Sequence, residues 1–134
     1  MALLADIRDG LEETLAAGLN DGVNVYRLPV DRIDAPAVVV MGFRMDPETM
    51  MASVRRVRAE LLVLVSRRHV DQVDLLDALV DPSVDGSVLD VLAADSSLGG
   101  RVDSAIVTMV GDYGELAVGD IGYYSASVSL EVLG

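Results

Sequence analysis

The sequence contains no cysteine, no tryptophan and no lysine, and it has one histidine and one phenylalanine among its 134 residues. The absence of cysteine excludes disulfide bonds, thiolate nucleophiles and metal sites that need cysteine ligands. The single histidine, His69, follows Arg67 and Arg68, which disfavour its charged form, and it has no second histidine with which to share a metal. The sequence therefore lacks most of the residue types on which catalysis and metal binding depend.

Long apolar runs are also missing. The longest candidate, Leu61–Val65, is bracketed by Glu60 and Arg67, whereas a membrane-spanning helix needs about 20 consecutive apolar residues. The N-terminus carries Asp6 and Asp9 where a signal peptide would carry basic residues. We therefore expect a soluble protein of the cytoplasm that has no membrane partner.

Charge is unbalanced and segregated along the chain. The net charge is −12, which disfavours binding to phosphate backbones. Six of the ten arginines lie between residues 44 and 68, and seven aspartates without a base lie between residues 71 and 95. A solvated helix face explains the acidic stretch. The functional alternative is that the acidic stretch of one subunit meets the basic stretch of another.

Hydrophobic periodicity in the first half predicts one helix and three strands. The helix covers residues 3–19, with an apolar residue at every fourth position (Leu3, Ile7, Leu11, Leu15, Leu19). A short strand is expected over residues 23–29, and the continuous apolar run 37–41 suits a strand buried on both faces. Residues 42–52 are expected to form a loop. Residues 53–66 fit both helical and strand spacing, and the β-branched density of their second half favours a strand.

The second half predicts two helices, over residues 70–80 and 86–94, and then two strands. In the helix over 70–80, the expected buried residues are Val73, Leu75, Leu76, Leu79 and Val80. A strand over 101–111 would place Val102, Ile106 and Val110 on one side and Ala105, Val107 and Met109 on the other. After a polar connection over 112–119, residues 121–133 alternate cleanly between apolar residues and Tyr123, Ser125, Ser127, Ser129 and Glu131, as in a half-exposed antiparallel strand.

These elements predict an α/β (α+β) fold within a single domain, residues 1–134. Its core would be one mixed, mainly antiparallel sheet of about five strands, flanked by two or three helices in the order α-β-β-β-α-(α)-β-β.

No catalytic, cofactor or metal site is predicted, and we do not expect an enzyme. Ser125 and its neighbouring serines lie on a strand and not on a nucleophile elbow. Leu98, Gly99 and Gly100 lack the spacing of a phosphate-binding loop, so we interpret them as a structural turn that needs positive φ. The acidic side of the helix over 70–80 has no calcium-binding loop pattern, and a solvated face explains it better than a cation site.

The candidate functional residues are instead those of an interface. The predicted loop 42–52 holds half of the methionines, which either fill gaps in the core or form an adaptable contact surface. With the segregated charges, the candidate interface residues are Arg44, Met45, Met50, Met51, Arg55 and Arg56 on the basic side, and Asp71, Asp74 and Asp77 on the acidic side.

One segment carries a family resemblance. Residues 95–103 (Asp-Ser-Ser-Leu-Gly-Gly-Arg-Val-Asp) lie between a leucine-rich helical region and a strand. A tyrosine-bearing hairpin and a final alternating strand follow. In this element order, which covers most of the chain, the sequence resembles the tail terminator (tail-completion) proteins of long-tailed bacteriophages. The Leu98-Gly99-Gly100 turn is the one motif that can be carried over by residue, and the predicted loop 42–52 looks like a long loop of that family.

The resemblance implies a virion protein of the tail and neck, assembled in the host cytoplasm. Such proteins form a hexameric ring that caps the tail tube, ends its polymerisation and provides the joint to the head. The implied partners are further copies of the chain, the tail tube protein and a head or neck connector protein. No cofactor and no sequence-specific recognition of nucleic acid are implied, since DNA passes through the ring. Two alternatives stay open: another neck protein, such as a head-closure or connector subunit, and a regulatory α/β domain with a polar small-molecule pocket.

Overall fold

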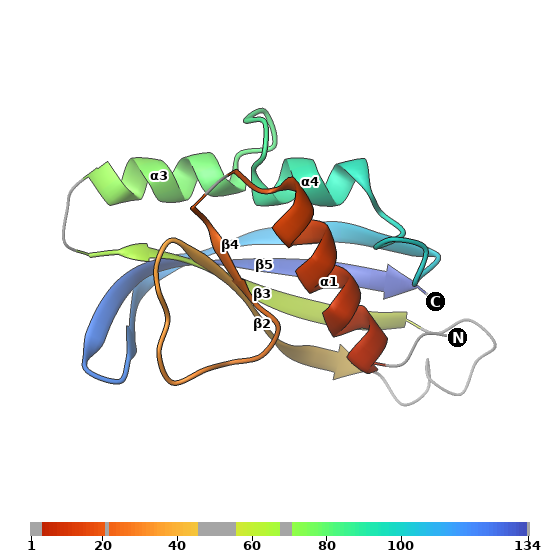
Figure 1. Cartoon of the computed structure of the whole chain (residues 1–134), viewed down its shortest axis with the longest axis horizontal. Coiled ribbons are helices and arrows are strands. Elements are labelled where there is room, and N and C mark those ends of the chain that lie inside the picture. Colours follow the sequence, from red (N-terminus) through yellow and green to blue (C-terminus); the bar gives the residue numbers. More distant parts are fainter. Residues whose placement is uncertain (1–3, 21, 46–55, 68–70, 134) are drawn as a thin grey trace.

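The computed structural model describes residues 4–20, 22–45, 56–67 and 71–133. Its centre is a five-stranded sheet in the order β1-β2-β3-β5-β4 (Figure 1). The strands are β1 (Asn24–Tyr26), β2 (Ala37–Met45), β3 (Arg56–Ser66), β4 (Ser104–Val118) and β5 (Ile121–Leu133). β1 is parallel to β2 and the other pairs are antiparallel. The predicted mixed, mainly antiparallel sheet is therefore confirmed, as is the element order α-β-β-β-α-α-β-β.

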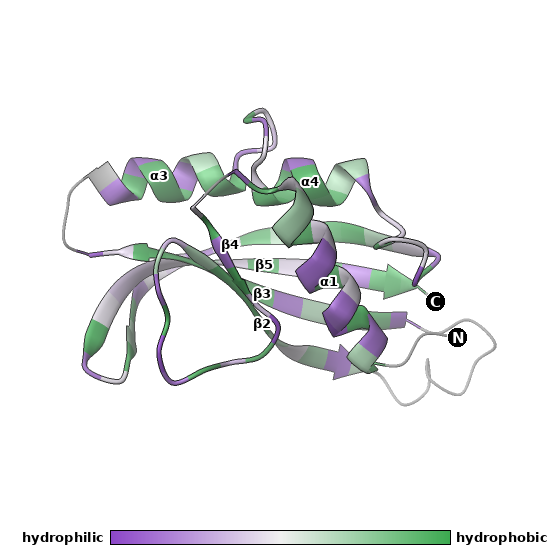
Figure 2. Cartoon of the chain, viewed as in Figure 1, coloured by the Kyte–Doolittle hydropathy of each residue, from purple (hydrophilic) through white to green (hydrophobic). Residues whose placement is uncertain are grey.

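The three helices of the described residues, α1 (Leu4–Gly18), α3 (Asp71–Val80) and α4 (Val88–Ala94), lie together on one face of the sheet (Figure 1). α1 packs against β1 and β2, α3 against β3 and β5, and α4 against β4. The fourfold spacing of α1 buries Ile7, Leu11 and Leu15, while its outward side is hydrophilic (Figure 2). Ser87 caps the N-terminus of α4 by accepting a hydrogen bond from the Asp90 backbone N–H at 3.2 Å.

The helix-facing side of the sheet forms the main core. The alternation predicted for residues 121–133 is confirmed, since the apolar positions of β5 pack against the helices. They meet alternate residues of β2 and β3, and the buried set is Val38, Val40, Ala59, Leu61, Val63, Val65, Ala126, Val128, Leu130 and Val132. The other side of β5 was expected to be exposed, but Tyr123 and Ser125 on it are buried. In α3, Leu76, Leu79 and Val80 are buried as expected, but Val73 is 41% exposed, so its predicted burial was wrong.

The opposite side of the sheet, called the open face below, carries no helix within the described residues. One end of it is covered by the connection between β1 and β2, where Ile33 packs with Val39, Leu64 and Tyr123. The Tyr123 hydroxyl donates a hydrogen bond to the Ile33 carbonyl at 2.6 Å. This cover explains why the first residues of β2 are buried on both faces, as the continuous apolar run predicted.

Strand β2 is longer than the sequence predicted. Residues 42–45 were expected to begin a loop, but they continue the strand to Met45. A register shift between Val40 and Gly42 lets the pairing with β3 resume after the apolar run ends. The prediction was wrong because residues 42–45 become a strand by pairing with the first half of β3. That pairing cannot be recognised from the sequence of β2 alone.

Strand β4 also differs from its prediction. It begins at Ser104, not at residue 101, and it runs through the expected polar connection to Val118. Register shifts between Val107 and Met109 and between Gly111 and Gly114 accommodate these extra residues. The first shift also changes the predicted sides: Ala105, Val107 and Val110 line the core side, whereas Ile106 and Met109 are exposed.

Candidate assembly surface

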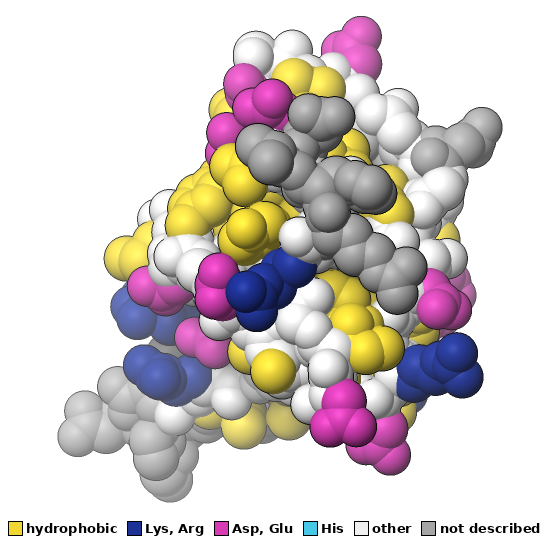
Figure 3. Space-filling model, turned by 90° about the vertical axis from the view of Figure 1, so that its left-hand side faces the viewer, with side chains coloured by type: hydrophobic (Ala, Val, Ile, Leu, Met, Phe, Trp, Pro, Cys, Tyr) yellow, Lys and Arg dark blue, Asp and Glu magenta, His cyan; other side chains and the backbone are white. Residues whose placement is uncertain are grey.

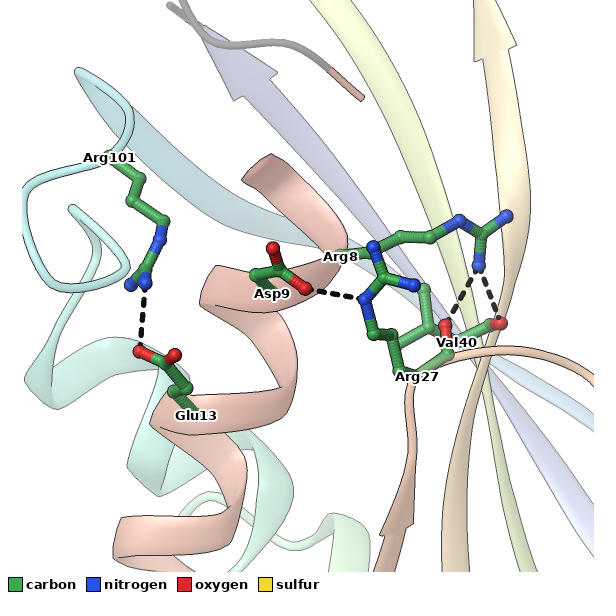
Figure 4. Close-up of polar contacts among 6 residues, drawn as sticks. All are labelled: Arg8, Asp9, Glu13, Arg27, Val40 and Arg101. Carbon is green, nitrogen blue, oxygen red and sulfur yellow. Dashed lines mark hydrogen bonds and ion pairs between the residues drawn. The ribbon is translucent and has the colours of Figure 1, made fainter. Parts of the chain in front are cut away.

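The first part of the candidate surface is the outer edge of β2. β1 pairs only with residues 37–39, so within the described residues no strand flanks the outer side of β2 beyond Val39. One guanidinium nitrogen of Arg8 donates hydrogen bonds to the carbonyls of Val40 (3.1 Å) and Arg27 (2.9 Å), at the point where β1 leaves the sheet (Figure 4). The same guanidinium lies 4.9 Å from the centroid of the Phe43 ring. Arg8 therefore marks the end of the pairing between β1 and β2, and beyond this point β2 is an edge of the sheet.

Two ion pairs join α1 to segments that flank the sheet (Figure 4). Asp9 pairs with Arg27, just after β1. Glu13 pairs with Arg101 at 2.9 Å and so ties α1 to the turn that precedes β4. α1 therefore connects the segments next to both edges of the sheet.

Arginines gather on the open face beside this edge. Arg44 and Arg58 are direct cross-strand neighbours on β2 and β3. Arg56 forms an ion pair with Glu131 of β5, with 2.6 Å between Nε and Oε1. Neither Arg44 nor Arg58 forms an ion pair within the part of the chain that the structure describes. This end of the open face is therefore basic and incompletely neutralised.

The structure places only some of the candidate interface residues near one another. Arg44 and Met45 end β2, Arg56 begins β3, and all three are exposed at the same end of the sheet. Met50, Met51 and Arg55 lie outside the described residues. Asp74 and Asp77 are exposed on α3, and Asp71 begins that helix, although its side chain is not described. Since α3 belongs to the helical layer, Asp74 and Asp77 do not meet the basic group within one chain.

One residue on the acidic side of α3, Asp77, interacts with Tyr113 of β4. Burial raises the pKa of Tyr113, and the charge of Asp77, together with the hydrogen bond that the Tyr113 hydroxyl donates to it, raises that pKa further. Asp81 adds a smaller contribution to the same pKa. Asp77 therefore lies toward β4, the edge of the sheet farthest from Arg44.

The second part of the candidate surface is β4 itself, which forms that far edge. On its open-face side, Ile106 is 59% and Met109 is 65% exposed. Apolar side chains also lie exposed among charged ones at the end of the molecule that holds the β4–β5 turn (Figure 3), and Ile121 beside that turn is half exposed. Sequence reasoning missed this surface, because nothing in the sequence signals the register shift at Thr108 that places Met109 on the same side as Ile106.

A cavity of about 350 Å³ lies between α4 and β4. Its lining is apolar except for one serine and consists of Pro82, Leu89, Leu92, Ala93, Ser96, Ala105, Ile106 and Val107. A smaller cavity of about 70 Å³ lies on the open face beneath the β1–β2 connection, and its lining is entirely apolar. The chemistry that these cavities offer is the burial of apolar side chains.

The predicted glycine turn is structural. Gly99 and Gly100 have positive φ, as expected, and so does the fully buried Leu98, at 52°. Asp95 organises the turn by accepting hydrogen bonds from the Ser97 hydroxyl (2.9 Å) and the Gly99 backbone N–H (3.0 Å). The Ser97 hydroxyl is also the main reason that the pKa of Asp95 is lowered. The turn seats Leu98 against α1, where a Cβ on Gly10 would lie 3.0 Å from the Leu98 Cβ.

Within the described residues, no group of three histidine, aspartate or glutamate side chains is arranged to hold a metal ion. No helix in the same residues has the length and apolar character needed to cross a membrane. Comparison with models of known protein families gives no match, and a search of curated proteins likewise gives none. The features that bear on function are therefore the two edges of the sheet and the family resemblance of the sequence.

Proposed function

We propose that this protein is a structural component of a bacteriophage tail. Copies of the chain form a ring that caps the tail tube, ends its polymerisation and provides the joint to the neck and head. The observation that carries the proposal is the pair of sheet edges: on their outer sides, β2 beyond Val39 and the whole of β4 have no neighbouring strand within the described residues. Exposed edges of this length are templates for pairing with another chain.

The two edges suit a ring because they are different surfaces. A ring requires a heterologous interface, in which one patch of a subunit meets another patch of its neighbour. β2 is antiparallel to β3, β3 to β5, and β5 to β4, so β2 and β4 run in opposite directions. A second copy placed beside the first in the same orientation therefore presents its β2 antiparallel to β4.

The charge of the chain supports the same proposal. Six copies would carry six times the −12 charge of one chain. An acidic ring forms few phosphate contacts, so DNA could pass through it without being held. The lining of the α4–β4 cavity, with one serine among apolar residues, favours protein assembly over a small-molecule regulatory role, because small-molecule sites combine apolar walls with several converging polar groups.

The test is the state of phage tails that are assembled without this protein. We expect over-long, ragged tubes when the gene is disabled, and a six-fold ring at the end of normal tails in electron micrographs. Tails of normal length that lack heads would instead assign the protein to head–tail joining. A chain that stays monomeric and never associates with tails would overturn the proposal.

A further inference from the structure

We propose that the free part of β2, Met41–Met45, pairs with the first half of β4, Ser104–Val110, in the adjacent copy, and that Met45 enters the cavity between α4 and β4. The inference rests on the ring of the proposed function and names the surfaces that meet within it. It describes strand addition, in which main-chain hydrogen bonds join the strands and alternate side chains fill a neighbouring apolar pocket.

Pairing within one chain already aligns these segments. Met45 pairs with Val57, Val57 with Val132, and Val132 with Ala105, so Met45 and Ala105 lie on one row across the sheet. By the same route, Arg44 lies on the row of Ile106. If a second copy continues the rows without a shift, its Met45 lies beside Ala105.

The side chains then face the appropriate sides. Val132 and Ala105 belong to the helix-facing core, and the buried Val57 pairs directly with Val132, so Met45, on the same row, also lies on that side. Ala105 lines the α4–β4 cavity, together with Leu89 and Leu92 of α4. In the isolated chain Met45 is 40% exposed, and the unbranched methionine side chain adapts well to an irregular apolar cavity.

The lengths of the two free edges also match. β1 covers residues 37–39 of β2 from outside, so an incoming β4 can reach β2 only beyond Val39. Along the rows of the sheet, Val39 corresponds to Gly111 of β4, where the register shift between Gly111 and Gly114 begins. Each of the two segments holds one register shift, at Met41 in β2 and at Thr108 in β4, so the regular pairing joins Phe43–Met45 to Ala105–Val107. The second half of β4 lies where β1 of the neighbour would stand.

Charge is compatible with this pairing. Along the rows, Arg44 lies beside Ile106, and Asp103, which precedes β4, is the acidic residue nearest to Ile106 in the chain on that side. Asp112 and Glu115 lie beyond Gly111, outside the paired half of β4. The paired segments therefore oppose no like charges, which would be unfavourable across a strand pair.

A disulfide crosslink tests the pairing directly, because the chain has no cysteine of its own. The double variant Arg44→Cys with Ile106→Cys places one thiol on each edge, at exposed open-face positions of a single row. These strands are separated by β3 and β5 within one chain, so a disulfide must join two copies. Opposite residues of an antiparallel pair have the Cα separation that a disulfide requires. Mild oxidation should give a ladder of covalent oligomers on a non-reducing gel that ends at the ring size.

Three controls make the result decisive. Each single-cysteine variant should give no ladder, and dimers from Ile106→Cys alone would establish the β4–β4 arrangement and overturn the proposal. The mismatched pair Arg44→Cys with Ile121→Cys should remain uncrosslinked. Rings seen by electron microscopy without the 44–106 crosslink would reject this interface and leave the ring intact, whereas the absence of rings would reject the proposed function itself.

A second variant tests the cavity. Met45→Asp places a carboxylate where an apolar side chain is expected to be buried, so self-association measured by sedimentation should weaken by roughly tenfold or more. Val73→Asp is the matched control, because Val73 has nearly the same exposure (41%) on α3 and lies outside the proposed contact. Equal effects of the two substitutions would overturn the role of Met45.

Discussion

Arg44 of β2 and Arg58 of β3 are direct cross-strand neighbours on the open face of the sheet, and both are exposed. Like charges at such positions destabilise a strand pair. Arg58 is also the direct neighbour of Glu131 on β5, whereas Arg44 faces only an arginine across the strand pairs that the structure describes. In the proposed ring, Asp103, which precedes β4 of the adjacent copy, is the acidic residue nearest in the chain to the row of Arg44.

The variant Arg44→Glu separates stability from assembly. It converts the like-charged pair into an attractive one, so the free energy of unfolding of the isolated chain should rise by about 0.2–1 kcal/mol. The same change places a negative charge on the contacting part of β2, toward Asp103 of the adjacent copy, so self-association should weaken. Urea denaturation at low protein concentration and sedimentation at high concentration measure the two effects.

Arg44→Ala serves as the control for this prediction. It relieves the repulsion without adding attraction, so both of its effects should be smaller than those of Arg44→Glu. Stronger self-association in Arg44→Glu than in the parent chain would contradict the charge argument.

The sequence predicted the sheet, its mainly antiparallel pairing and the order of elements, because these follow from periodicity within each segment. The apolar alternation of β5 needs no knowledge of its neighbours. The lengths of β2 and β4 could not be obtained in this way, because residues 42–45 and 112–118 become strand by pairing with β3 and β5. Their own composition, which includes glycine and polar residues, favours a loop.

The candidate site was predicted in part. Charge segregation pointed to Arg44 and Arg56 on one side and to Asp77 on the other, and the structure places them near opposite edges of the sheet. The position of Met109 on the open face beside Ile106 could not be predicted, because it depends on a register shift at Thr108 that leaves no trace in the apolar pattern. The α4–β4 cavity depends on the packing of two elements and has no local sequence signal.

Gly18 allows α1 to lie directly against α4. A Cβ added at Gly18 would come within 2.6 Å of one γ-methyl of Val91 and 2.9 Å of the other. Because Val91 is buried and its β-branched side chain has little rotamer freedom in a helix, Gly18→Ala should destabilise the fold by about 1–3 kcal/mol. Gly114→Ala is the control, since nothing lies within 4 Å of its added Cβ. Equal unfolding midpoints for the two variants would show that the helices separate easily.

The hydrogen bond from the Tyr123 hydroxyl to the Ile33 carbonyl holds the β1–β2 connection over the open face. Tyr123→Phe keeps the buried ring but leaves that carbonyl without its donor, so the free energy of unfolding should fall by about 1–3 kcal/mol. Tyr26→Phe provides a matched control. The Tyr26 hydroxyl accepts a hydrogen bond from the Asp34 backbone N–H in an exposed setting, where water can replace it, so its loss should cost less. A larger effect at Tyr26 would show that the buried bond contributes little.

Tyr113 should titrate above an ordinary tyrosine, because burial and the nearby Asp77 both raise its pKa. The neutral form is favoured in the folded chain, so this contribution to stability is complete below the unfolded-state pKa near 10 and is lost as the pH rises through the higher pKa of the folded state. NMR titration of the tyrosine rings can follow the group directly, with Tyr113→Phe to assign the signal. Asp77→Asn should lower the Tyr113 pKa only part of the way to its ordinary value, since burial, the larger cause, remains. Asp74→Asn, an exposed change on the same helix, should leave it in place. A full return to the ordinary value in Asp77→Asn, or an equal shift in Asp74→Asn, would mean that Tyr113 is not held against α3 as the structure has it.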